Sequence, residues 1–168
     1  MTPRLSLEEL VDRSELIVHG RCMRSWSAWD AGHQFIWTHH EIQVSDPLKG
    51  APGSTVVVSE PGGILDGMEL LIEGLPRYQD GEEMVLFLFK TPIGFWRTRG
   101  LGQGKYGVVA DAAPGQRLRA DLNGAVLIEP AGAAAAKGTD LQRLNGVRLQ
   151  EFKSMVRGLA TRPVKGAK

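Results

Sequence analysis

Residues 84–89 read Met-Val-Leu-Phe-Leu-Phe, an apolar run without a polar interruption, and the turn signal Asp80-Gly81-Glu82 precedes it. Short apolar runs bounded by turn residues are typical of strands that are covered on both faces. The run therefore predicts a central strand of a sheet, with other parts of the chain packed on both sides of it.

Shorter strand patterns separated by glycine-rich turns surround this run. Glycine contributes 21 of the 168 residues, about twice the usual ~7% share, and such punctuation favours a β-rich fold. No alternation of strands with helices is present, which argues against a parallel sheet. The predicted strands are 16–23, 35–45, 55–60, 95–98, 106–110, 118–122 and 125–128, the last two forming a hairpin around Asn123-Gly124.

Helices are predicted at both ends. Ser6 and Glu9 have capping-box spacing, which starts a helix over residues 7–13. Apolar residues at helical spacing predict a second helix over 148–160. We therefore expect one domain over residues 5–160: a mainly β, partly open, antiparallel OB-like barrel with an N-terminal and a C-terminal α-helix. Residues 161–168 are expected to form a flexible basic tail, and the alanine-rich segment 131–138 a surface loop.

Composition excludes several classes of function. A net charge of +1 does not indicate the broad basic surface of a nucleic-acid-binding protein. No apolar run approaches the ~18–20 residues of a membrane-spanning helix. Cys22 is the only cysteine, so an intrachain disulfide is impossible.

The segment from Phe35 to Gly50 reads FIWTHHEIQVSDPLKG and contains two adjacent histidines. Its period-two pattern is that of a strand, which places His39 with Glu41 on one face and His40 on the other. We expect Pro47 to interrupt the ladder because proline lacks the N–H group.

His39 and Glu41 are candidate metal ligands only if a neighbouring strand supplies a third ligand, because no zinc signature is present. Without one they form a polar pair on an exposed strand. If the hairpin turned about Ala31, His40 would lie opposite Cys22 and Val44 would lie opposite Val18. A Cys–His pair can activate a thiolate, although a small buried cysteine is the commoner case.

The tryptophans offer a second kind of candidate. If they are exposed, they form a surface of the type used to bind a partner or ligand; if loops and helices cover them, they belong to the packing. No catalytic residue or cofactor is assigned. The candidate binding residues are Trp29, Trp37, His39, Glu41 and Trp96.

Residues 102–107, Gly-Gln-Gly-Lys-Tyr-Gly, match the spacing of a dinucleotide-binding loop. Such a loop must open a helix at whose N-terminus the pyrophosphate binds. Here the glycines lead into Val108-Val109, a predicted strand, so we expect turn or bulge glycines instead.

The order of several motifs resembles a group of uncharacterised bacterial secreted proteins. The motifs are SLEELVDRSELIVHGRC, LKG, EPGG, GLPRY, DGEEMVLFL and GLGQGKYGVV, with LQEFKSMVRGLA near the end. The resemblance implies that Met1 replaces a removed leader, that the protein is secreted or periplasmic, and that it is associated with matrixin-type metalloproteases, whose genes lie near those of some members.

The arrangement is more distantly similar to netrin-like domains, including the tissue inhibitors of metalloproteinases, which have an OB-type barrel. Residues 14–20, 48–50 and 81–87 occupy the corresponding places. Those inhibitors chelate zinc through an N-terminal cysteine, and this chain has no cysteine before Cys22. The resemblance therefore implies the fold rather than that inhibitory chemistry.

We thus expect a non-enzymatic, exported interaction module whose partner is a secreted protein such as a metalloprotease. The alternative is a metal- or thiol-dependent hydrolase centred on the first hairpin, with His39, His40, Glu41 and Cys22. Oligonucleotide binding is suggested only by the fold and opposed by the charge. A cytoplasmic location and the oligomeric state stay open.

Overall fold

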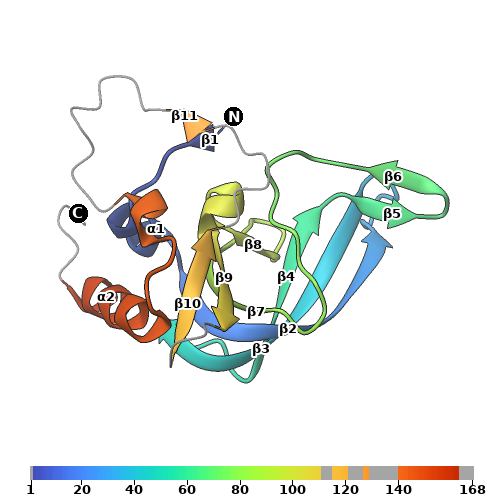
Figure 1. Cartoon of the computed structure of the whole chain (residues 1–168). Helices are drawn as coiled ribbons and strands as arrows, with labels where there is room; N and C mark the ends of the chain where they lie inside the picture. Colours follow the sequence, from blue (N-terminus) through green and yellow to red (C-terminus); the bar gives the residue numbers. More distant parts are fainter. Residues whose placement is uncertain (1, 111–114, 121–126, 129–139, 163–168) are drawn as a thin grey trace.

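A computed structural model of the chain describes residues 2–110, 115–120, 127–128 and 140–162 (Figure 1). Strands dominate it, and short helices accompany them. The strands are β1 (Thr2–Pro3), β2 (Leu16–Trp29), β3 (Ile36–Lys49), β4 (Thr55–Pro61), β5 (Gly63–Leu65), β6 (Met68–Leu70), β7 (Glu83–Lys90), β8 (Trp96–Thr98), β9 (Lys105–Ala110), β10 (Gln116–Ala120) and β11 (Leu127–Ile128). The helices are α1 (Leu7–Arg13) and α2 (Leu149–Thr161), with 3₁₀ turns at Leu101–Gly104 and Leu141–Leu144.

The main sheet has the order β10-β9-β7-β2-β3-β4-β8, and β8 pairs again with β7. The pairings therefore form a circuit from β7 through β2, β3, β4 and β8 back to β7. Closure is only partial, because β4 and β8 pair at a single position, Val58 with Trp96. This weakly paired seam positions the site described below.

The apolar run of β7 is buried on both faces, as its sequence predicts. Its even-numbered residues Met84, Leu86 and Leu88 pack inside the circuit of strands. Val85 and Phe87 face the other way, into a second core that also contains residues of α1 and α2. In Figure 1 the two helices lie on the same side of the molecule, and the β5–β6 hairpin projects on the opposite side.

Both helices agree with the sequence-based prediction. Ser6 caps α1: its hydroxyl accepts a hydrogen bond from the Glu9 N–H, and the Glu9 carboxylate accepts one from the Ser6 N–H, at 3.2 and 2.9 Å. Phe152 of α2 is fully buried and contacts Phe87 and Tyr106 with ring centroids 6.1 and 5.2 Å apart.

The predicted register of the first hairpin is wrong. Ser25 lies opposite His40, Cys22 opposite Ile42, and Val18 opposite Pro47. The turn is one to two residues later than predicted, and three register shifts along β2 and β3 move the pairs further. A bulge adds a residue to one strand and leaves its partner unchanged, so one turn position cannot fix every pair.

The prediction that Pro47 interrupts the strand is also wrong, since β3 continues to Lys49. The ladder between β3 and β4 ends at Gln43, with one more bond from the Val44 N–H to the Ser54 carbonyl. Beyond this point β2 is the only strand of the described residues that pairs with β3. A proline is tolerated where one side of a strand has no partner.

At the C-terminal side of the sheet, the predicted pairing of 118–122 with 125–128 is not found in the described residues. β10 pairs with β9, whereas Leu127–Ile128 pair in parallel with Thr2–Pro3. The turn at 123–124, the segment 131–138 and most of the basic tail lie outside the described residues. Neither α1, α2 nor any other helix in the described part of the chain has the length and apolar character needed to cross a membrane.

Candidate functional site

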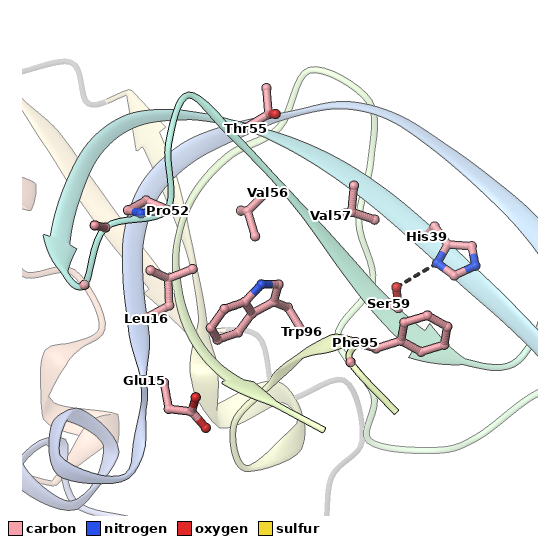
Figure 2. A pocket seen from close by; sticks show the side chains of 13 residues that line it. Glu15, Leu16, His39, Pro52, Thr55, Val56, Val57, Ser59, Phe95 and Trp96 are labelled. Carbon is pink, nitrogen blue, oxygen red and sulfur yellow. Dashed lines mark hydrogen bonds between the residues drawn. The ribbon is translucent and has the colours of Figure 1, made fainter. Parts of the chain in front are cut away.

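A cavity of about 650 Å³ opens at the seam between β4 and β8. One wall is formed by the first half of β4, and another by the segment that leads into β8. The start of β2 and the loop before β4 close one end (Figure 2). The lining residues are Glu15, Leu16, His39, Gly50, Ala51, Pro52, Thr55, Val56, Val57, Ser59, Gly94, Phe95 and Trp96.

The cavity exists because side-chain contacts hold β8 to β4 at one end of the seam and not at the other. At its far end Glu60 holds β8 firmly: its Oε1 accepts a hydrogen bond from the Thr98 N–H at 2.9 Å, and its Oε2 lies 3.3 Å from Arg97 Nε. Burial raises the pKa of the Glu60 carboxyl, while these two partners oppose the rise. On the N-terminal side of the Val58–Trp96 pair, no comparable side-chain link joins β4 to the segment before β8 among the described residues. The two segments separate there.

His39 lies at one end of the cavity. Its Nδ1 is hydrogen-bonded to Ser59 Oγ at 2.7 Å across β3 and β4 (Figure 2). Phe95 approaches the ring edge-on, with centroids 5.5 Å apart, and Trp26 lies 5.5 Å away on β2. Burial lowers the pKa of the His39 imidazole, so at neutral pH it is an uncharged hydrogen-bonding group.

Aromatic side chains extend the site along the outer face of the strands. Trp37 and Phe95 form an edge-to-face pair with centroids 5.0 Å apart. Trp96 lines the cavity itself. Edge-to-face pairs hold the rings in defined positions, which gives this part of the cavity a fixed shape.

The structure brings together three of the five predicted binding residues. His39 and Trp96 line the cavity, and Trp37 contacts Phe95 at its border. Glu41 and Trp29 are elsewhere. Glu41 forms an ion pair with Arg24 at 3.1 Å.

Trp29 lies near the tip of the first hairpin. It stacks on His33 with centroids 4.3 Å apart, and its indole N–H donates to Asp66 at 2.8 Å. These contacts connect the hairpin tip with the turn between β5 and β6, so the Trp29 contacts serve packing.

Sequence reasoning missed Phe95, Ser59 and the β4 edge. Ser59 and Val57 could have been placed by their position two residues apart on a predicted strand. Phe95 gave no signal of its own, because its contacts with His39 and Trp37 come from strands far away in the sequence.

Among the described residues, His39 and Glu41 have no third His, Cys, Asp or Glu close enough to complete a metal site with them. Within the ranges that the structure describes, no group of three or more His, Cys, Asp or Glu side chains is close enough to hold a metal ion.

The inner face of the hairpin carries a second polar group. His40 Nδ1 is 2.6 Å from Ser25 Oγ, and its ring stacks on Tyr78 at 4.2 Å. Cys22 Sγ lies 3.7 Å from the same hydroxyl. Burial raises the pKa of the Cys22 thiol, partly offset by the Ser25 hydrogen bond, and burial lowers the pKa of His40 to about 4. The neutral thiol and neutral imidazole are the stable forms at neutral pH.

The dinucleotide-like glycine segment also has a structural explanation. Gln103 is buried in the 3₁₀ turn, where its side chain accepts from the Leu5 N–H and donates to the Pro3 carbonyl, both at 2.9 Å. The segment therefore fixes the N-terminus of the chain against the sheet.

Comparison with known proteins adds no relative: no family model, no curated protein and no solved structure matches the chain.

Proposed function

We propose that the protein is a non-enzymatic binding module and that the cavity between β4 and β8 is its ligand site. The observation that carries the proposal is the accessible cavity of about 650 Å³ with Phe95, Trp96 and Val57 in its walls. Ligand sites are concave and place directed polar groups among apolar walls. Here the polar side chains in the lining are those of Glu15, His39, Thr55 and Ser59.

We further propose that the scaffold is an OB-like barrel. The five-strand circuit β7-β2-β3-β4-β8 supports this proposal, since OB-type barrels are five-stranded and partly open. The netrin-like motif order at residues 14–20, 48–50 and 81–87 is consistent with it.

Export of the protein and a secreted metalloprotease partner are proposals that rest on the resemblance to bacterial secreted proteins. The sequence of the full-length gene product tests export directly: a leader ahead of Thr2 supports it, and a cytoplasmic protein without one contradicts it. Co-purification from the native secretome, compared between wild type and a cavity variant, tests the protease partner.

The ligand site is tested by Phe95→Ala, with Ile93→Ala as the matched control. Both residues lie between β7 and β8, and Ile93 is 65% exposed and does not line the cavity. A panel of short synthetic peptides is titrated into isotope-labelled protein and followed by NMR. We expect shifts to concentrate at Thr55–Val57 and 94–96. Phe95→Ala should weaken peptide binding about tenfold, and Ile93→Ala should leave it unchanged.

Two results would contradict the site. One is peptide-induced shifts that fall away from the seam. The other is an equal loss of binding in Phe95→Ala and Ile93→Ala, because a loss that does not depend on the cavity wall cannot come from the cavity.

A hydrolase centred on the first hairpin is the second candidate, favoured by the short Ser25–His40 hydrogen bond beside Cys22. Elemental analysis of protein purified without an affinity tag, together with alkylation of Cys22, separates the two. Stoichiometric zinc, iron or copper, or rapid alkylation at neutral pH, would favour the hydrolase. Because Cys22 is buried and its thiol pKa is raised, we expect alkylation to be slow. Because no group of three or more possible metal ligands is present among the described residues, we expect no stoichiometric metal.

A further inference from the structure

The backbone of β4 has an unpaired edge. The Val44 N–H donates to the Ser54 carbonyl at 2.9 Å. Hydrogen-bonded pairs alternate with non-bonded pairs along an antiparallel ladder. Val56 therefore bonds to β3, whereas the backbone groups of Thr55 and Val57 point to the opposite side, toward β8.

On that side β8 covers only part of the strand. Its single parallel pair with β4, at Val58 and Trp96, engages the Val57 carbonyl and the Ser59 N–H. The Val57 N–H and both backbone groups of Thr55 are left without a partner among the described residues, and Thr55 and Val57 both line the cavity. An uncovered strand edge is a template for pairing with another chain.

The cavity reaches both faces of this edge. Leu16 and Val56 belong to the core inside the circuit of strands, and Trp96 packs against that core. Val57 and Phe95 lie toward the His39 end (Figure 2). Successive side chains of a strand point to opposite faces, so a strand laid along β4 would place alternate side chains against these two walls.

Charge distinguishes one end of the cavity. Glu15 lines it and is exposed. One carboxylate oxygen accepts a hydrogen bond from the Lys90 backbone N–H at 3.3 Å. The Arg99 guanidinium attracts this carboxylate from a longer distance, and among the described residues no cationic side chain forms a direct ion pair with it. The end near His39 carries no net charge at neutral pH, since burial lowers the pKa of that imidazole. A ligand with a basic group at one end complements this arrangement.

We propose that the ligand is an extended polypeptide segment that adds a short strand to the Thr55–Val57 edge and places a basic side chain beside Glu15. The inference rests on the proposed function and names its ligand class. Main-chain hydrogen bonds supply affinity in strand addition, and side-chain contacts on the two faces supply specificity. β-Branched residues, which suit a half-buried strand, should occupy the positions between the walls.

The test uses the probe acetyl-Lys-Val-Thr-Val-Thr-amide and the full chain. Two altered probes accompany it: one with N-methyl groups on alternate backbone amides, and one with norleucine in place of lysine. Calorimetry measures each against wild type, Glu15→Gln and the control Glu69→Gln, whose side chain is exposed on β6 outside the cavity.

We expect N-methylation on the pairing edge to weaken binding about tenfold or more, because it removes main-chain hydrogen bonds. Norleucine and Glu15→Gln should each weaken binding about three- to tenfold without adding to each other, since both remove the same charge pair. Glu69→Gln should have no effect.

The failures are distinguishable. Shifts at the cavity with equal binding of the N-methylated probe would overturn strand addition and leave the binding module in place. If the lysine probe does not bind, the inference is also overturned. If no peptide of the panel shifts the NMR signals of residues at the seam between β4 and β8, the proposed function itself is overturned. If the protein dimerises with rising concentration and the dimer competes with the probe, the Thr55–Val57 edge binds a second copy of the chain. This result would also overturn the inference.

Discussion

His40 is a buried imidazole held between polar and aromatic partners. Ser25 Oγ lies 2.6 Å from its Nδ1, Tyr78 stacks on its ring, and its side chain faces the interior of the sheet. Burial lowers its pKa from 6.5 to about 4, with smaller contributions from the nearby charges of His39 and Lys105. Protonating this group in the folded protein is therefore unfavourable.

Acid should destabilise the protein partly through His40. Between pH 6.5 and about 4 the unfolded chain binds a proton that the folded protein does not. Stability from this group is therefore complete above pH 6.5 and is lost as pH falls toward 4, by about 3 kcal/mol. His40→Gln should remove this dependence. Urea unfolding of both proteins at several pH values between 7 and 4.5 measures the difference.

The control is His33→Asn, at an exposed turn position with φ of 54°, a conformation that asparagine tolerates. This variant should retain the wild-type pH dependence. Parallel stability–pH curves for wild type and His40→Gln would contradict the assignment.

For individual residues, some features could be predicted from the sequence and others could not. Period-two alternation correctly placed His39 and His40 on opposite faces. The partner of His40 was wrong because bulges along β2 shift the register, and a bulge leaves no reliable mark in a single sequence. The role of Phe95 depends on strands that only the tertiary fold brings beside it.

At the scale of elements, two glycines show opposite constraints. Gly20 lies in β2, where a Cβ atom would be 2.5 Å from the Gln43 carbonyl oxygen and 2.8 Å from the Ile42 side chain. Gly158 lies in α2, and a Cβ atom there would meet nothing within 4 Å. One glycine permits close strand packing, and the other only weakens a helix.

Alanine substitutions should therefore have opposite signs. Gly20→Ala should lower the free energy of unfolding by about 1–3 kcal/mol through the backbone contact. Gly158→Ala should raise it by about 0.5–1 kcal/mol through helix propensity. Thermal and urea unfolding of the two single variants measures both. A stable Gly20→Ala protein would show that β2 and β3 separate more easily than the structure indicates.

Elements with strong local signals could be predicted from the sequence, and pairings between distant elements could not. The capping box at Ser6 marked α1, and the apolar run marked β7 with burial on both faces. The Asn123-Gly124 signal predicted a local hairpin, whose turn lies outside the described residues. The pairing of Leu127–Ile128 with Thr2–Pro3 was not predicted. A two-residue strand is placed by its tertiary partner, and local pattern contains no information about that partner.

At the scale of the whole molecule, the incomplete closure of the sheet creates the site. Glu60 fastens β8 to β4 through Thr98 and Arg97, residues that are 38 and 37 positions away in the sequence. Before the Val58–Trp96 pair the strands diverge, and the free edge of β4 becomes one wall of the cavity. No sequence pattern marks this opening, because it depends on where a parallel pairing stops.

Amide hydrogen exchange at β4, measured residue by residue by NMR, tests the central claim most directly. In the free protein the Val57 amide should exchange quickly and the Val56 and Val58 amides slowly, because only the latter two point to β3. Binding of acetyl-Lys-Val-Thr-Val-Thr-amide should slow exchange at Val57 and leave its neighbours unchanged. A Val57 amide that is already protected in the monomeric free protein, or that stays unprotected in the saturated complex, would contradict a ligand site at this edge.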